Sequence, residues 1–310
     1  MSESSDTGKG SGFGRWLRLG IGGLLLGWLL SRVGGEELGA ALLGAAPLPL
    51  FAALLAFVAL ISLQGERLSQ LGGGAIRARE GASLQLRGIF FNNFLPTNVG
   101  GDGYKVAALV ARGLDWTRAG LIVGTDRLWS LGAVAVAGIA VLPALGPRLT
   151  TDLAGFPPWA IAAVLAVGVA GLSAAFWLLA RRVRRRSGGE PLPRLGGTKL
   201  ARVAALSAAA VGVRLGRFAA LGAALTVDLT LGEWVLVIVV LNLTALLPFT
   251  PGALGIQEGA IVALLLALGA DSDSATALAL INRAITWLGA LVGGLIWLRG
   301  RRDSPAPTSG

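Results

Sequence analysis

Long runs of apolar residues, separated by short polar or basic stretches, follow one another along the chain from residue 19 to residue 298. Such runs are typical of helices that cross a membrane, whose hydrocarbon core requires about 20 apolar residues. We expect about six full spans, of which the first needs its flanking residues to cross: 19–30, 50–63, 119–142, 159–180, 203–227 and 275–298. A short interfacial helix is expected at 36–46. The pattern therefore predicts an all-α polytopic membrane helix bundle.

Two further apolar stretches are interrupted by prolines and glycines. The first consists of short runs at 84–95 and 102–112, and the second of runs at 234–247 and 256–268. A helix of 12 residues is only about 18 Å long, against about 30 Å for the hydrocarbon core. Irregular backbone at membrane depth is tolerated only where it is buried or lines a cavity, so each stretch is predicted to be a re-entrant helical hairpin, with full spans as the alternative. The predicted structural breaks are Pro96, Gly100, Gly101, Pro248, Pro251, Gly252 and Gly255.

The two interrupted stretches are copies of each other. A constant offset of 156 in residue number carries Asp102 onto Glu258 and Arg127 onto Arg283, and it also matches glycines, leucines and aspartates around them. Helix breaks and charges that recur at fixed spacing within hydrophobic segments indicate a duplicated transporter-type site. We expect a single transmembrane domain over 15–302, with repeat one at about 15–142 and repeat two at about 159–298.

The distribution of Lys and Arg predicts the orientation of the spans. The N-terminus, the stretches 64–88 and 181–202 and the C-terminus are basic and are expected in the cytoplasm, whereas 143–157 and 228–233 are poor in Lys and Arg. Arg67, Arg77, Arg79 and Arg87 are expected to share one cytoplasmic loop. This topology makes the two hairpins enter from opposite faces, so the repeat is inverted. The tails 1–14 and 303–310 lie outside the domain, and the first is expected to be disordered.

Composition narrows the possible chemistry. The 310 residues are 54% hydrophobic with mean hydropathy +0.71, which is far from the norm for soluble proteins. The chain has no Cys and no His, which excludes thiolate nucleophiles, histidine acid–base catalysis and Cys/His metal sites, and no cofactor or metal is predicted. The net charge of +10 follows the membrane topology, so nucleic acid is not an expected partner.

Charged residues within the hydrophobic segments are the candidate site. The predicted substrate-binding residues are Asp102, Tyr104, Lys105, Asp126, Arg127, Arg214, Arg217, Glu258 and Arg283. A lone arginine in the hydrocarbon core is costly, so such residues pair with carboxylates, face an interior or bind a ligand. The five cations in this set exceed its three carboxylates by two, and this excess suits a ligand with an anionic group such as a lipid phosphate.

Alternatives remain for individual members of the set. For Asp126 and Arg127, a structural ion pair is about as plausible as a functional role. The ligand interpretation leads for Arg214 and Arg217, because their span contains no carboxylate. Asp102 and Glu258 either cap the helices that follow the glycine-rich breaks or titrate and couple transport to protons.

These motifs resemble the flippase-like membrane family related to the transmembrane domain of lysylphosphatidylglycerol synthase. The resemblance rests on LPTNVGGDGYK at 95–105, the Asp126-Arg127 pair, LPFTPGALGIQEG at 247–259, and Arg283. It implies an inner-membrane protein that moves lipids or lipid-linked precursors between leaflets. Fused relatives carry a separate aminoacyl-transfer domain, which we do not expect here because only twelve residues follow the last predicted span.

The sequence thus favours a lipid flippase or transporter for an anionic phospholipid or lipid-linked precursor, with membrane lipids as its partners. Two other classes stay open. One is a membrane enzyme that acts on a lipid phosphate or polyprenyl phosphate, with Asp102 or Glu258 as the acid–base group. The other is a scaffold for envelope assembly that transports nothing.

Overall fold

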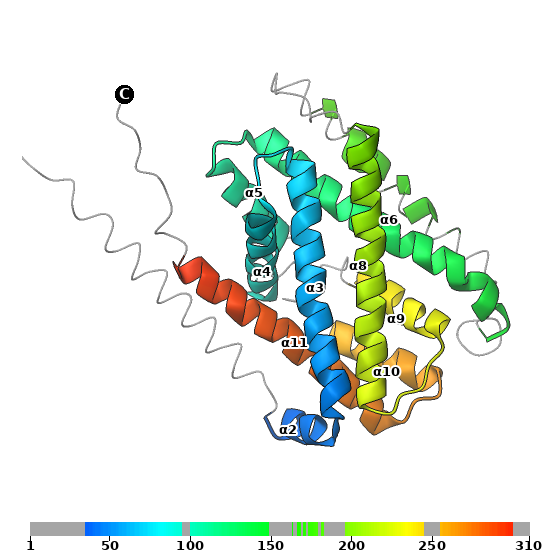
Figure 1. Ribbon diagram of the computed structural model, residues 1–310. Coiled ribbons are helices and arrows are strands. Elements are labelled where there is room, and N and C mark those ends of the chain that lie inside the picture. The colour runs from blue at the N-terminus through cyan, green and yellow to red at the C-terminus, as the bar shows by residue number, and fades with distance from the viewer. Residues whose placement is uncertain are drawn as a thin grey trace, which may run out of the picture.

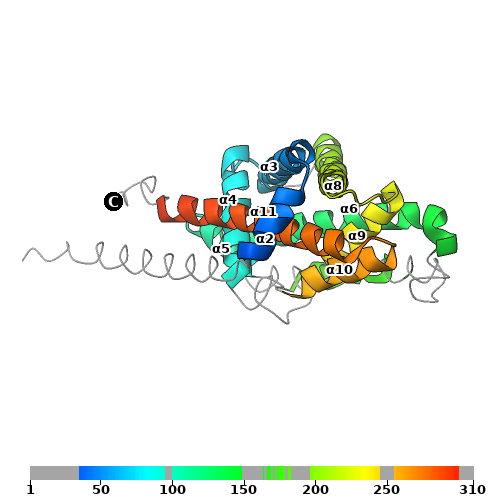
Figure 2. The same cartoon turned by 90° about the horizontal axis from the view of Figure 1, so that it is seen from below.

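The computed structural model describes residues 35–94, 100–148, scattered positions between 163 and 182, 196–244 and 255–299 (Figures 1 and 2). Within these residues the regular secondary structure consists of α-helices, so the all-α prediction is confirmed. The helices, labelled as in Figure 1, are α2 (Gly35–Gly44), α3 (Pro47–Gly72), α4 (Ala78–Phe94), α5 (Gly100–Val110), α6 (Trp116–Arg148), α8 (Gly197–Ala224), α9 (Leu231–Thr244), α10 (Ile256–Ala267) and α11 (Ser272–Arg299).

Four of the described helices, α3, α6, α8 and α11, are long and apolar enough to cross a membrane. They correspond to four of the six predicted spans. The predicted span 19–30 lies outside the described residues, and 159–180 is described only in pieces, which are helical. The lipid-facing side of α3 carries exposed apolar residues at helical spacing: Leu48, Phe51, Leu55 and Val58.

The predicted basic loop at 64–88 is wrong. Helix α3 continues through Arg67 and ends only at Gly73, whose φ of 62° lets its N–H bond back to the carbonyl of Gln70. Arg79 and Arg87 lie on α4, so the connection is short. Several polar side chains of this stretch are paired: Gln70 donates to Glu66 within α3, Arg202 of α8 also donates to Glu66, and Arg67 donates to Asp126 of α6. In the same way, Lys199 and Arg202 of the predicted loop 181–202 belong to the start of α8.

The helices form two repeats of four, α3–α6 and α8–α11, and each repeat runs long, short, short, long. The last two helices of the second repeat begin where the offset of 156 places them: α5 at Gly100 and α10 at Ile256, α6 at Trp116 and α11 at Ser272. Neighbouring α3 and α8 run in opposite directions, and the α4–α5 and α9–α10 hairpins start from opposite ends of the bundle (Figure 1). The repeat is therefore inverted.

Equivalent aspartates begin the last helix of each repeat. Asp115 accepts a hydrogen bond from the backbone N–H of Thr117 at 2.9 Å, and Asp271 accepts one from Ser274 at 2.8 Å. Side-chain oxygens in this position satisfy backbone donors that the first helical turn leaves without partners. The bond from the Ser274 N–H holds the pKa of Asp271 below its usual range. The duplication thus preserves local capping chemistry as well as helix order.

The two repeats are interleaved. Helix α4 of the first repeat packs against α11 of the second, α9 of the second packs against α6 of the first, and α3 lies beside α8 at one edge of the bundle (Figure 2). Glycine permits the closest of these contacts: a Cβ on Gly293 of α11 would lie 2.1 Å from the carbonyl oxygen of Leu86 on α4. Each hairpin is thus held partly by the opposite repeat.

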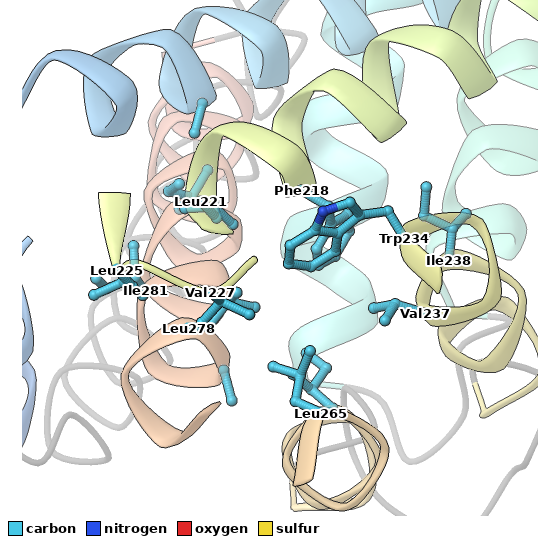
Figure 3. Close-up of a cluster of buried hydrophobic side chains, with 14 of the residues drawn as sticks. Phe218, Leu221, Leu225, Val227, Trp234, Val237, Ile238, Leu265, Leu278 and Ile281 are labelled. Carbon is cyan, nitrogen blue, oxygen red and sulfur yellow. The ribbon is translucent and has the colours of Figure 1, made fainter. Parts of the chain in front are cut away.

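Two main apolar clusters hold this arrangement together. The larger one joins α8, α9, α10 and α11 through Phe218, Trp234, Ile238 and Leu265 (Figure 3) and extends to α3 and α6. The smaller cluster contains residues of α3, α4, α5 and α6, together with Val203 of α8. Because lipid tails are as apolar as these side chains, van der Waals packing rather than removal from water stabilises such contacts between membrane helices.

Candidate functional site

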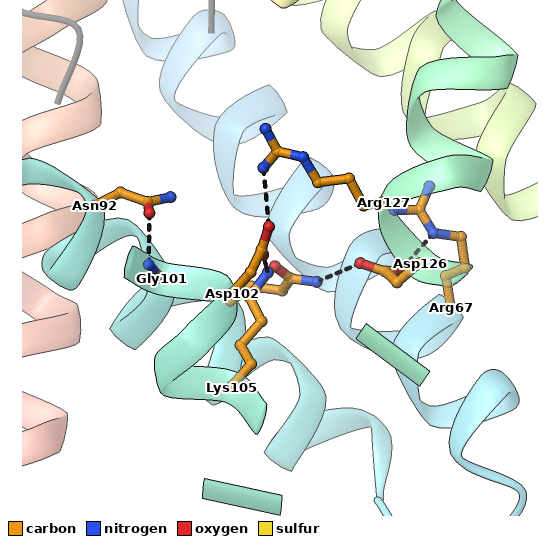
Figure 4. A network of polar contacts seen from close by, with 8 residues as sticks. Arg67, Asn92, Gly101, Asp102, Lys105, Asp126 and Arg127 are labelled. Carbon is orange, nitrogen blue, oxygen red and sulfur yellow. Dashed lines mark hydrogen bonds and ion pairs between the residues drawn. The ribbon is translucent and has the colours of Figure 1, made fainter. Parts of the chain in front are cut away.

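The repeated charges predicted from the sequence form repeated ion pairs. Arg127 Nη1 on α6 donates to Asp102 Oδ2 on α5 at 3.0 Å (Figure 4), and Arg283 Nε on α11 donates to Glu258 Oε1 on α10. Each carboxylate is the third residue of its short helix, because α5 begins at Gly100 and α10 at Ile256. The constant offset between the repeats therefore relates equivalent contacts in the structure as well as equivalent positions in the sequence.

The two carboxylates differ in their remaining partners. Asp102 also accepts from Lys105 Nζ at 3.1 Å, whereas Glu258 Oε2 accepts from the backbone N–H of Gly255 at 2.8 Å and so caps its own helix. Gly255 has φ of 81°, a conformation that favours glycine. Glu258 thus caps its helix and also binds an arginine.

A separate buried network surrounds Asp126. Arg67 Nε donates to Asp126 Oδ1 at 2.7 Å and Gln85 Nε2 donates to Asp126 Oδ2 at 3.3 Å (Figure 4). Arg67 Nη1 also donates to Ser207 Oγ at 3.3 Å. Arg67 is 2% exposed and Asp126 is 5% exposed. The neighbouring residues Asp126 and Arg127 therefore serve different networks rather than one another.

Sequence analysis missed Arg67, because it was placed in a basic loop. A usable signal was present: Ala53, Phe57, Leu60, Gln64 and Arg67 follow one another at steps of three or four residues. That spacing continues the inward face of α3 through the polar residues.

Arg214 and Arg217 are paired with amides instead of carboxylates. Arg214 Nη1 donates to Asn242 Oδ1 at 3.1 Å, and Arg217 Nη2 donates to Asn282 Oδ1 at 2.7 Å and to its backbone oxygen at 3.3 Å. The Arg217 guanidinium also lies 5.2 Å from the ring centre of Phe57, as in a cation–π contact. Within the described ranges, neither arginine has a carboxylate at ion-pair distance.

Four arginines from both repeats line one cavity of about 300 Å³: Arg127, Arg214, Arg217 and Arg283. The rest of its polar lining consists of amides and one hydroxyl: Gln64, Asn92, Asn93, Asn242, Gln257, Asn282 and Thr286. No carboxylate is among the described lining residues, since Asp102 and Glu258 stand behind the arginines they bind. The structure therefore brings together the four arginines predicted from the sequence.

The other predicted residues lie away from the cavity lining. Tyr104 stacks on Phe91 with ring centres 4.3 Å apart and accepts a hydrogen bond from Arg87 at 3.4 Å. Lys105 is buried against Asp102, and Asp126 is occupied by Arg67. The geometry gives these side chains packing and pairing partners, and it leaves the cavity to the arginines and amides.

Four of the predicted breaks lie outside the described residues: Pro96, Pro248, Pro251 and Gly252. Gly100 and Gly101 form the first turn of α5 rather than preceding the helix. Gly101 donates its N–H to Asn92 Oδ1 at 2.6 Å, and a Cβ there would lie 2.2 Å from the carbonyl oxygen of Gly88. Its role is therefore the close approach of α5 to α4.

The cavity can bind an anion through guanidinium and amide donors. Across the residues that the structure describes, no three Asp or Glu side chains gather as a metal site would require.

A family profile described as the lysylphosphatidylglycerol synthase TM region matches residues 15–294. The chain belongs to this family. The matched range includes both repeats except the last residues of α11, and it contains the four cavity-lining arginines and both carboxylates behind them, so the resemblance drawn from the motifs is confirmed. Together with the four apolar helices, membership establishes a multi-pass membrane protein. No curated protein matches the chain.

Proposed function

We propose that the protein is a lipid transporter of the inner cell membrane, which moves an anionic phospholipid or lipid-linked precursor between leaflets. The observation that carries the proposal is the cavity between the repeats, into which four arginines project without a carboxylate among the described lining residues. Arginines at membrane depth need a counter-charge, and a phosphate supplies one with oxygens that match the guanidinium fork. A headgroup in the cavity would satisfy them while its acyl chains stay in lipid.

Inverted repeats suit movement between two faces, because exchanging the conformations of the halves exposes the same site to the opposite side. The two hairpins, each of two short helices, are the moving parts in this proposal and enter the membrane without crossing it. The side chain of Arg127 is 32% exposed and that of its counterpart Arg283 is 6% exposed. This difference supports one of two alternating states, in which the Arg127 side is open.

The ion pairs supply the coupling between headgroup and hairpin. Asp102 belongs to α5 and Glu258 to α10, so a shift of either hairpin would separate a carboxylate from its arginine. An arginine released in this way would gain the lipid phosphate as its partner. Exchange of one anion for another keeps each guanidinium compensated throughout the movement.

The orientation follows from charge at the two ends of the bundle. The end where α3 stops and α8 begins carries Arg77, Arg79, Lys199 and Arg202, while the opposite end carries Asp228, Asp271 and Asp273 (Figure 1). Because Lys and Arg are retained on the cytoplasmic side, this difference supports a cytoplasmic position for the first end, the side on which both termini are predicted.

The test is leaflet exchange of labelled phosphatidic acid, phosphatidylglycerol and phosphatidylcholine in proteoliposomes. Wild type is compared with Arg127→Ala and Arg283→Ala, and with Arg202→Ala as a matched control, because Arg202 forms an exposed pair with Glu66 outside the cavity. Exchange of at least one anionic lipid is expected for wild type and the control, and loss of that exchange for both cavity variants. Folded wild type that exchanges none of the three lipids would refute the proposal.

The same preparation separates the other two classes. A labelled lipid phosphate that returns chemically altered would indicate an enzyme. A fixed protein partner that co-purifies, with no lipid movement in vesicles, would indicate a scaffold.

A further inference from the structure

Arg67 and Arg217 occupy equivalent places in the two repeats. Arg67 lies as far along α3 from its first residue, Pro47, as Arg217 lies along α8 from its first residue, Gly197. Their partners are equivalent too. Asp126 on α6, which binds Arg67, is carried by the offset of 156 onto Asn282 on α11, which binds Arg217. One buried contact has therefore been duplicated.

The second partner of each arginine completes the correspondence. Arg67 crosses from α3 to Ser207 on α8, and Arg217 crosses from α8 to lie over Phe57 on α3. Phe57 and Ser207 also lie equally far from the first residues of their helices. The two sites thus share their geometry but differ in both partners, with Asp replaced by Asn and Ser by Phe.

The replacement changes the charge of the site. In the first repeat Asp126 cancels the charge of Arg67, whereas in the second the amide of Asn282 accepts a hydrogen bond and cancels nothing. Arg217 is nevertheless buried, with only 6% of its surface exposed. A buried charge without a counter-ion destabilises the folded protein. Arg214, one helical turn earlier, likewise donates to an amide, that of Asn242. The second copy of the contact is therefore incomplete by itself.

Two polar atoms support a missing occupant. In the part of the chain that the structure describes, Arg217 Nε has no acceptor and Asn93 Oδ1 has no donor, although both are buried. The amide nitrogen of Asn93 already donates to the carbonyl of Ile89, so its oxygen is left as an acceptor. Both residues line the cavity. The oxygens of a phosphate monoester would accept from Arg217 Nε, and the P–OH of its singly protonated form would donate to Asn93 Oδ1.

We propose that Arg214 and Arg217 bind the phosphate of a lipid whose headgroup is a phosphate monoester or a diphosphate, carries about two negative charges and has no amino group. Asn282 determines this specificity. The proposal rests on the proposed function and names its substrate class. Asn282 holds Arg217 in place as Asp126 holds Arg67, but it leaves the positive charge of Arg217 available to the ligand.

The charge balance of the cavity selects the class. Four lining arginines against the two carboxylates behind them leave at least two positive charges without compensation. A phosphate monoester carries about −1.5 to −2 at neutral pH and has three acceptor oxygens. A phosphodiester with one negative charge would leave an excess. A zwitterionic or aminoacylated headgroup would also bring an ammonium into a cavity whose described lining holds no carboxylate.

The test restores in the second repeat the chemistry of the first. Asn282→Asp changes an amide into a carboxylate of the same shape and gives Arg217 the partner that Arg67 already has. Ser272→Asp is the matched control, because it adds the same charge at the exposed start of the same helix. Binding of phosphatidic acid, phosphatidylglycerol and phosphatidylethanolamine to the purified full chain is measured in nanodiscs, with inorganic phosphate as a competitor.

Wild type is expected to bind phosphatidic acid at least tenfold more tightly than phosphatidylglycerol. Asn282→Asp should lose at least tenfold in affinity for phosphatidic acid without a fall in melting temperature, and Ser272→Asp should behave as wild type. Competition by inorganic phosphate would show that the anion alone is recognised, and its absence that the lipid chains are required. Both results agree with the proposal.

Unchanged binding of phosphatidic acid by folded Asn282→Asp would overturn the inference, and so would equal affinity of wild type for the three lipids. If that variant does not fold, Asn242→Asp next to Arg214 carries the same expectation. Leaflet exchange by wild type despite such a result would leave the proposed function intact. If Asn282→Asp loses its affinity for phosphatidic acid but wild type exchanges no lipid between leaflets, the transporter proposal is refuted. The proposed phosphate-binding site is then still supported.

Discussion

Arg127 and Arg283 lie at equivalent positions of the two repeats, and each binds a carboxylate 25 residues earlier in the chain. Their surroundings are not equivalent, because the Arg127 side chain is 32% exposed and the Arg283 side chain is 6% exposed. A duplicated sequence has thus produced two related contacts in different environments, and the consequences of removing each arginine should differ.

Arg283→Gln should destabilise the protein more than Arg127→Gln. Loss of Arg283 leaves Glu258 with no other cation at ion-pair distance among the described residues, whereas Asp102 keeps Lys105. Breaking a buried pair costs about 3–5 kcal/mol, and breaking an exposed one about 1 kcal/mol or less. In detergent micelles, the melting temperature of Arg283→Gln should therefore be lower than that of Arg127→Gln. The reverse order of melting temperatures would contradict the assignment of partners.

Removing one partner of the Arg67–Asp126 pair should lower the free energy of unfolding strongly, whereas replacing both partners should lower it little. Arg67→Met or Asp126→Leu alone leaves an uncompensated buried charge, with an expected loss of about 3–5 kcal/mol. The double variant removes both charges and should recover much of that loss. A double-mutant cycle of melting temperatures measures the coupling. Additive effects of the two substitutions would show that the residues do not interact.

Gly101→Ala should disturb the α4–α5 hairpin, because the new Cβ would lie 2.2 Å from the Gly88 carbonyl oxygen. Overpacking of this kind costs about 1–3 kcal/mol. Gly103 on the same helix is a matched control, since a Cβ there meets nothing within 4 Å. Gly103→Ala should be neutral or stabilising by up to about 1 kcal/mol, as alanine favours helix. Equal melting temperatures for the two variants would refute the close approach.

Single cysteines can report the topology, because the chain contains none of its own. Arg77→Cys and Arg112→Cys, at exposed positions before and after the first hairpin, should react with an impermeant maleimide from the same face. Asp228→Cys and Asp271→Cys flank the second hairpin and should react from the opposite face. Labelling of Arg77→Cys and Arg112→Cys from different faces would mean that the first hairpin crosses the membrane.

The sequence predicted most of the framework and four members of the cavity. Apolar runs located four long helices, and recurring charges located Arg127 and Arg283 with the carboxylates they bind. The same reasoning placed Arg67 in a loop, because a polar stretch at the end of an apolar run looks like the edge of a membrane. Helix α3 continues there because Arg67 finds Asp126 on another helix, a partner 59 residues away.

The sequence by itself determined the helical class, the duplication and the charges within it, because hydrophobic length, helix breaks and residue spacing are local properties of the chain. Only the tertiary structure decided which charges compensate one another. Asp126 and Asn282 differ by one atom group at equivalent positions, yet their effect is visible only once Arg67 and Arg217 are known to face them. Helix packing sets those distances, and the electrostatic balance of a buried site depends on distance rather than on order along the chain.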